Sequence, residues 1–112
     1  MEIPKNELGY DLNVYDRGGY LNNYAEDSTE WVILVHHLER GYDGQLQTGE
    51  WIEGIELPLT LEESDQLTLG LAPEHGGKYG SDEDFFIDPA GFLEVYGDAV
   101  PDRVLAFVKQ FI

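Results

Sequence analysis

The residues best suited to chemistry are two adjacent histidines, His36 and His37, inside an apolar segment. An imidazole can act as a general acid, a general base or a metal ligand near neutral pH. Neighbouring side chains of a strand point to opposite faces, so these two rings cannot share one metal ion. Each ring would need a positioned partner, and nothing in the sequence supplies one. We therefore predict no catalytic residue, no metal site and no cofactor, and we expect that the protein is not an enzyme.

A second candidate is the acidic cluster Asp82, Glu83 and Asp84, followed by Asp88. Calcium prefers such oxygen ligands, but an EF-hand loop needs glycine at its sixth position, where counting from Asp82 gives Ile87. On a strand, Asp82, Asp84 and Asp88 would share a face, which permits a weak cation site. A solvated acidic loop is the simpler interpretation, and we prefer it.

Other chemistry is excluded by composition and by missing motifs. The chain has no cysteine, which rules out disulfides, thiolate zinc sites and cysteine nucleophiles. It contains no G-x-S-x-G, P-loop or G-x-G-x-x-G pattern. Its six Lys and Arg residues are too few for ordinary nucleic-acid recognition.

Charge is the strongest functional signal. The 112 residues include 23 Asp and Glu, and the formal net charge is −17. Between Arg40 and Lys78 there is no lysine or arginine. A field of one sign attracts the opposite sign and accelerates encounter with it, whereas it repels nucleic acid and anionic membranes. The sequence therefore predicts a basic protein as partner. Because 42% of the residues are hydrophobic, the chain should fold rather than stay disordered.

The first half of the chain predicts strands. Residues 8–15 alternate between apolar and polar side chains, as a half-buried strand does. Residues 31–38 begin with five apolar residues, typical of a central strand, and a turn follows at 41–44. Residues 45–59 favour another strand, with bulges or a bend at its glycines and an edge position or exit at Pro58.

The second half predicts helices and a hairpin. Thr60 and Glu63 fit a capping box at the start of a short helix that extends to about Leu69. Residues 85–96 favour a hairpin around Asp88-Pro89-Ala90-Gly91, which suits a type I turn. The alternative is a helix capped by Asp88, with proline at its first position and Gly97 at its end. A terminal helix opens at Pro101, and its apolar residues follow helical spacing: Val104, Phe107, Val108 and Phe111.

The expected fold is α+β: a single domain, residues 1–112, with an antiparallel or mixed sheet of about four or five strands and one or two helices, including the C-terminal one. No apolar run approaches the length of a membrane span. The N-terminal residues do not resemble a signal peptide, so we expect a cytoplasmic protein. The oligomeric state is left open.

The predicted partner-binding surface combines carboxylates with aromatic anchors. Trp51 lies among three glutamates, and Tyr79 precedes the acidic cluster. The alternative for Trp51 is a place in the core, because large aromatic side chains are mostly buried. The predicted partner-binding residues are Glu50, Trp51, Glu53, Glu56, Tyr79, Asp82, Glu83 and Asp84.

Small size, the absence of cysteine, strong acidity and aromatic residues among carboxylates together give a profile that resembles the immunity proteins of bacterial toxin systems, of the contact-dependent inhibition or colicin type. The resemblance concerns the whole chain, and no residue motif carries it. It implies a cytoplasmic inhibitor that covers a basic toxin domain, often a nuclease. Two alternatives remain open: a DNA mimic that inhibits a DNA-binding enzyme, and a small ligand-binding or enzymatic α+β domain.

Overall fold

The structure is a computed structural model that describes residues 2–16, 30–70, 77 and 85–112. Its elements follow in this order: β1 (Tyr10–Asp16), β2 (Trp31–Arg40), β3 (Leu46–Pro58), α2 (Leu61–Gln66), β4 (Phe85–Ile87), α3 (Pro89–Tyr96), a 3₁₀ turn (Gly97–Ala99) and α4 (Asp102–Lys109). The predicted α+β class and C-terminal helix are confirmed. The described residues form three α-helices, one more than expected.

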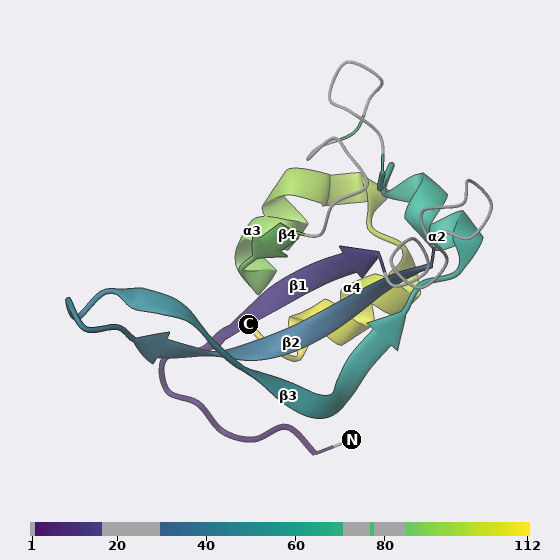
Figure 1. Ribbon diagram of the computed structural model, residues 1–112. Helices are drawn as coiled ribbons and strands as arrows, with labels where there is room; N and C mark the ends of the chain where they lie inside the picture. The colour runs from purple at the N-terminus through teal and green to yellow at the C-terminus, as the bar shows by residue number, and fades with distance from the viewer. Residues whose placement is uncertain (1, 17–29, 71–76, 78–84) are drawn as a thin grey trace.

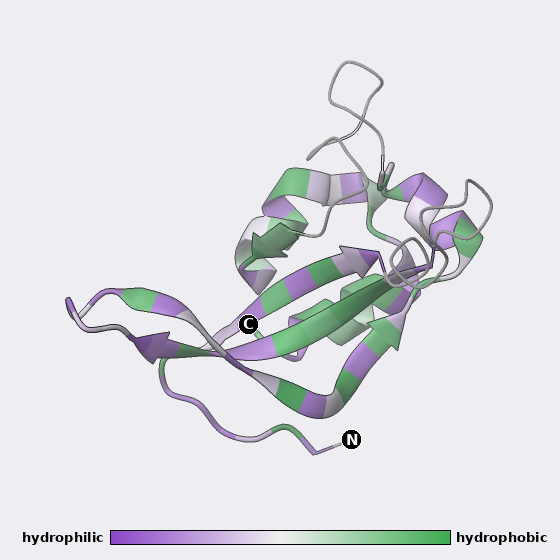
Figure 2. Ribbon diagram, in the orientation of Figure 1, coloured by the Kyte–Doolittle hydropathy of each residue, from purple (hydrophilic) through white to green (hydrophobic). Residues whose placement is uncertain are grey.

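The four strands of the described residues pair antiparallel in one sheet, in the order β3-β2-β1-β4 (Figure 1). The central place predicted for residues 31–38 is confirmed, because β2 pairs with β1 on one side and β3 on the other. The first half of β2 is continuously hydrophobic, whereas hydrophobic and hydrophilic residues alternate along β1 (Figure 2). The edges of the sheet are the long β3 and the short β4.

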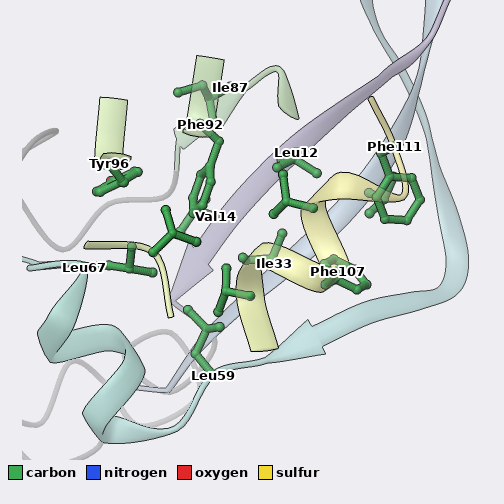
Figure 3. Packing of buried hydrophobic residues seen from close by; sticks show 14 of the residues in the cluster. Leu12, Val14, Ile33, Leu59, Leu67, Ile87, Phe92, Tyr96, Phe107 and Phe111 are labelled. Atoms are coloured by element: carbon green, nitrogen blue, oxygen red, sulfur yellow. The ribbon is translucent and has the colours of Figure 1, made fainter. Parts of the chain in front are cut away.

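The core lies between one face of the sheet and the helices. Leu12 and Val14 of β1 and Ile33 and Val35 of β2 are fully buried on this face. Phe107 of α4 packs beside them, as Figure 3 shows. The predicted stripe of α4 is confirmed, because all four of its residues are buried: Val104, Phe107, Val108 and Phe111.

The hairpin predicted for residues 85–96 is wrong, and the helical alternative is right. The Asp88 carboxylate accepts a hydrogen bond from the Gly91 N–H at 3.0 Å and caps α3, with Pro89 at its first position. Phe92 and Tyr96, one turn apart, are buried in the core, and their rings lie 4.8 Å apart. Asp and Pro suit both a turn and a helix start, and the burial of these two rings favours the helix.

This correction also removes Asp88 from the weak cation site that a strand would permit. Its carboxylate serves as a helix cap, and the residue follows β4 instead of lying on a strand with the other acids. The remaining members of the acidic cluster, Asp82, Glu83 and Asp84, lie outside the described residues.

The capping box of α2 is confirmed: Glu63 N–H donates to Thr60 Oγ1, and Thr60 N–H donates to the Glu63 carboxylate. The helix ends at Gln66, earlier than expected. Glu63 also binds Arg103 of α4, with Nη2 to Oε1 at 2.5 Å and Nε to Oε2 at 2.9 Å. Nη2 donates further to Pro58 O at 2.6 Å, so Arg103 joins α4, α2 and the end of β3.

The hydrogen bonds from Arg103 lower the pKa of Glu63 from 4.5 to about 2. A carboxylate whose pKa is depressed by folding stabilises the native state above its unfolded pKa, and this contribution is lost as the pH falls toward the folded value. Because Arg103 is half exposed, we expect Arg103→Ala to lower the free energy of unfolding at pH 7 by only about 1 kcal/mol. Urea denaturation should show the difference from the parent protein shrinking between pH 4.5 and pH 2. Lys109→Ala, which removes the same charge from the same helix, is the control, and an equal Arg103→Ala effect at every pH would contradict this role for Glu63.

Candidate functional site

The β2 and β3 strands extend from the body of the protein as a hairpin (Figure 1). The predicted turn is confirmed, with Gly41 N–H donating to Gln45 O at 2.8 Å and the Arg40 guanidinium donating to Gly44 O at 2.9 Å. Gly44 has φ of +80°, a value that favours glycine. The hairpin therefore has a defined turn that can present side chains away from the core.

Three large apolar side chains are exposed on this hairpin and the adjoining part of β3. They are Tyr42, Leu46 and Trp51, and Trp51 is 45% exposed. The alternative that Trp51 belongs to the core is therefore wrong, and Ile52 is buried in its place. Exposed aromatic side chains surrounded by polar ones are a common feature of protein interfaces.

Four acidic residues share the same region and are all exposed: Glu39, Asp43, Glu50 and Glu53. Arg40 is the one basic residue between positions 39 and 53. Within the described part of the chain, Arg103 and Glu63 form the one ion pair, and it lies on α4 and α2. We refer below to the exposed residues Glu39, Tyr42, Asp43, Leu46, Glu50, Trp51 and Glu53 as the hairpin surface.

The predicted partner-binding residues divide into two sets. Glu50, Trp51, Glu53 and Glu56 all lie on β3, the first three exposed and Glu56 partly buried. Tyr79, Asp82, Glu83 and Asp84 lie outside the described residues. The structure thus brings half of the predicted set together on one edge strand.

The predicted irregularities of β3 are confirmed, and they shape this surface. His36 pairs with Trp51 and Leu34 pairs with Glu56, so residues 52–55 lie opposite Val35 alone. Gly54 supports this bulge with φ of +89°. β3 bends sharply as a result (Figure 1). Ile52 and Ile55 are both buried although they are three residues apart, while Glu53 between them is exposed.

The sheet face away from the core carries a second group of residues, which we call the covered polar cluster: Asp11, Asn13, His36, Trp51 and Phe86. Strand register places them on one face, because Asn13 pairs with Phe86, Asp11 with His36, and His36 with Trp51. The rings of His36 and Phe86 meet edge to face at 5.5 Å. β1 runs between their two strands, so this contact crosses above β1 and covers Asp11 and Asn13.

The polar side chains of the covered polar cluster are deeply buried. Asp11 is 9% exposed and accepts a hydrogen bond from Thr48 Oγ1 at 2.5 Å. Asn13 is 7% exposed, and its Oδ1 is buried with no hydrogen-bond partner. A buried acceptor without a donor costs about 1–3 kcal/mol of stability, so Asn13 is a costly residue at this position.

The two histidines have different hydrogen-bond partners. His36 Nδ1 lies 3.0 Å from Gly49 O, and because a carbonyl only accepts, Nδ1 must carry the proton. His37 Nδ1 lies 3.1 Å from Asn6 Nδ2. Asn6 Nδ2 also donates to Leu38 O, and Asn6 Oδ1 accepts from Leu8 N–H, which fixes the amide orientation. His37 Nδ1 must therefore accept, and its proton lies on Nε2.

We expect long-range ¹H–¹⁵N NMR spectra at pH 8 to show His36 as the Nδ1–H tautomer and His37 as the Nε2–H tautomer. The reason is that each Nδ1 faces a partner that can only accept or only donate. Asn6→Ala should abolish the preference at His37 and leave His36 unchanged. The same tautomer at both positions would contradict these hydrogen bonds.

In the residues that the structure describes, no three His, Asp or Glu side chains gather as a metal site would require. The described helices include none that is long and apolar enough to cross a membrane. Comparison with protein-family models, curated proteins and solved structures finds no match for the chain.

Proposed function

We propose that the protein is a cytoplasmic inhibitor that binds a basic protein through the hairpin surface. The observation that carries this proposal is the exposure of Tyr42, Leu46 and Trp51 among carboxylates in a chain of net charge −17. Exposed apolar side chains supply the contacts that hold a complex together, and the surrounding charge selects the partner.

The hairpin surface combines both requirements on one projecting element. Its carboxylates attract a basic partner over a distance of about one Debye length, roughly 8–10 Å in physiological salt. The aromatic side chains can then enter the partner's surface, because they lie near the end and along the edge of the hairpin. The bulges of β3 interrupt the regular edge, which disfavours simple strand addition and favours recognition by side chains.

The partner class that suits this surface best is a nuclease-type toxin domain. A nuclease groove is basic because it binds phosphates, so an acidic protein both associates with it rapidly and competes with its substrate. The resemblance in overall profile to toxin-immunity proteins supports the same assignment. The protein would then protect the cell that produces the toxin.

Co-expression provides the test. If a neighbouring gene encodes a basic toxin domain, co-expression of this protein should restore growth to cells that produce that domain. Purified protein should also inhibit the nuclease at a stoichiometric ratio. A variant with lysine at positions 50 and 53 should protect less well. Unimpaired nuclease activity in the presence of excess protein would contradict the proposal.

A further inference from the structure

We propose that the covered polar cluster binds a single arginine side chain of the basic partner. This inference rests on the proposed function and adds the chemistry of one specific contact to it. It concerns the sheet face opposite the core, where Asp11 and Asn13 lie beneath His36 and Phe86, and this face shares one residue, Trp51, with the hairpin surface.

The polar side chains of the cluster carry several acceptor atoms, and one of them is buried without a donor. Asn13 Oδ1 is buried and has no partner. The Asp11 carboxylate has two oxygens, and the hydrogen bond from Thr48 uses Oδ2. In the neutral form of His36 the proton is on Nδ1, and Nε2 is then an acceptor. Three acceptors, one of them negatively charged, call for a ligand that offers several N–H groups and a positive charge.

A guanidinium group meets this requirement better than other cations. It is planar, permanently charged and presents five N–H donors in a fixed arrangement. It also stacks on aromatic rings, and two lie beside His36: Trp51 is its partner in the strand register, and the Phe86 ring contacts the His36 ring. An ammonium group has three donors and is more strongly hydrated. The described residues offer no third acidic or imidazole group for a metal ion.

Access to the cluster depends on Phe86. Its ring is 48% exposed, and it belongs to β4, a strand of three residues at the edge of the sheet. Rotation of this side chain away from His36 would uncover Asn13 without disturbing the pairing of β1 and β2. The exposed ring would then be free to stack on the incoming guanidinium.

The test is an NMR titration of the full chain with the peptide acetyl-Gly-Arg-Gly-amide at low salt. We expect saturable shifts at the side-chain amide of Asn13 and the indole N–H of Trp51. The lysine peptide should bind more weakly, and the neutral citrulline peptide should not bind. Asn13→Leu and Asp11→Asn should each weaken binding by about tenfold or more, since the first removes the buried oxygen that has no partner and the second removes the negative charge. Asp98→Asn removes a similar charge from an exposed position on the 3₁₀ turn and should leave binding unchanged.

The inference would be overturned by equal binding of the arginine and citrulline peptides, by shifts that never saturate, or by binding that survives in both cluster variants. An ordered water on Asn13 Oδ1, without any arginine binding, would overturn it as well. The proposed function fails separately. The peptide titration tests the arginine site alone, because no partner protein is present in it. Salt-dependent binding of a basic partner tests the hairpin surface, and that result would stand even if the arginine site were refuted.

Discussion

Asn13→Leu is expected to raise the free energy of unfolding by about 1–2 kcal/mol. The parent side chain buries an oxygen that has no hydrogen-bond partner, on a central strand and beneath two rings. Leucine has the same branching, removes the unsatisfied oxygen and adds apolar contact with His36 and Phe86. For a domain of this size the gain corresponds to an increase in Tm of about 3–8 °C.

Urea denaturation at pH 7 measures this effect, and Asn6→Leu is the matched control. The Asn6 amide is satisfied at both ends, by Leu8 N–H on Oδ1 and by Leu38 O and His37 on Nδ2. The same substitution should therefore destabilise the protein at position 6 and stabilise it at position 13. A loss of stability in Asn13→Leu would show that the Asn13 amide is satisfied after all. Residues that reduce stability are often kept for function, which is why Asn13 directs attention to its surroundings.

The second large effect concerns association with the basic partner. Replacing both Glu50 and Glu53 with lysine changes the formal net charge from −17 to −13, since each replacement adds two charges. We expect the association rate constant to fall by about 10- to 100-fold at low salt, because these carboxylates lie beside the contact residue Trp51. Trp51→Ala should instead accelerate dissociation, because it removes an anchor and leaves the charge unchanged. Stopped-flow or surface-based kinetics separates the two rate constants.

The matched control is the double variant Glu62→Lys and Glu94→Lys. Both positions are exposed, one on α2 and one on α3, and the net charge of the variant is the same −13. It should slow association much less than the β3 variant does. Equal slowing by the two variants would mean that only total charge matters, and the hairpin surface would lose its special role.

The parts of the fold that follow from the sequence are those with strong local signals. The Thr60 capping box, the apolar stripe of α4 and the uninterrupted apolar start of β2 all form as predicted. In each case the pattern is independent of distant residues. Pro58 likewise ends the edge strand, as its missing N–H requires.

Residues 88–97 show where local signals are insufficient. Asp, Pro and Gly at this spacing suit a turn and a helix start equally, and burial of Phe92 and Tyr96 favours the helix. Such packing depends on residues far away in the chain, so a pattern of ten residues cannot reveal it.

The covered polar cluster was missed for a related reason. Asp11 and Asn13 alternate with Leu12 and Val14, and this pattern assigns them to a solvated face. They are buried because rings from two neighbouring strands meet above them. Only the register of β1, β2 and β4 shows that contact. The sequence contains one indication of this cover, the Phe85-Phe86 pair. Two adjacent rings on a strand must point to opposite faces of the sheet, so one of them has to lie on the face away from the core.

The most direct test of the central claim is affinity capture from cells that make the protein, with the parent chain and the Glu50→Lys, Glu53→Lys variant as parallel baits. We expect a basic protein to be enriched on the parent bait at about 50 mM salt, to be strongly reduced on the variant bait, and to be released at about 500 mM salt. Enrichment of the same proteins on both baits, or of acidic proteins only, would contradict that claim.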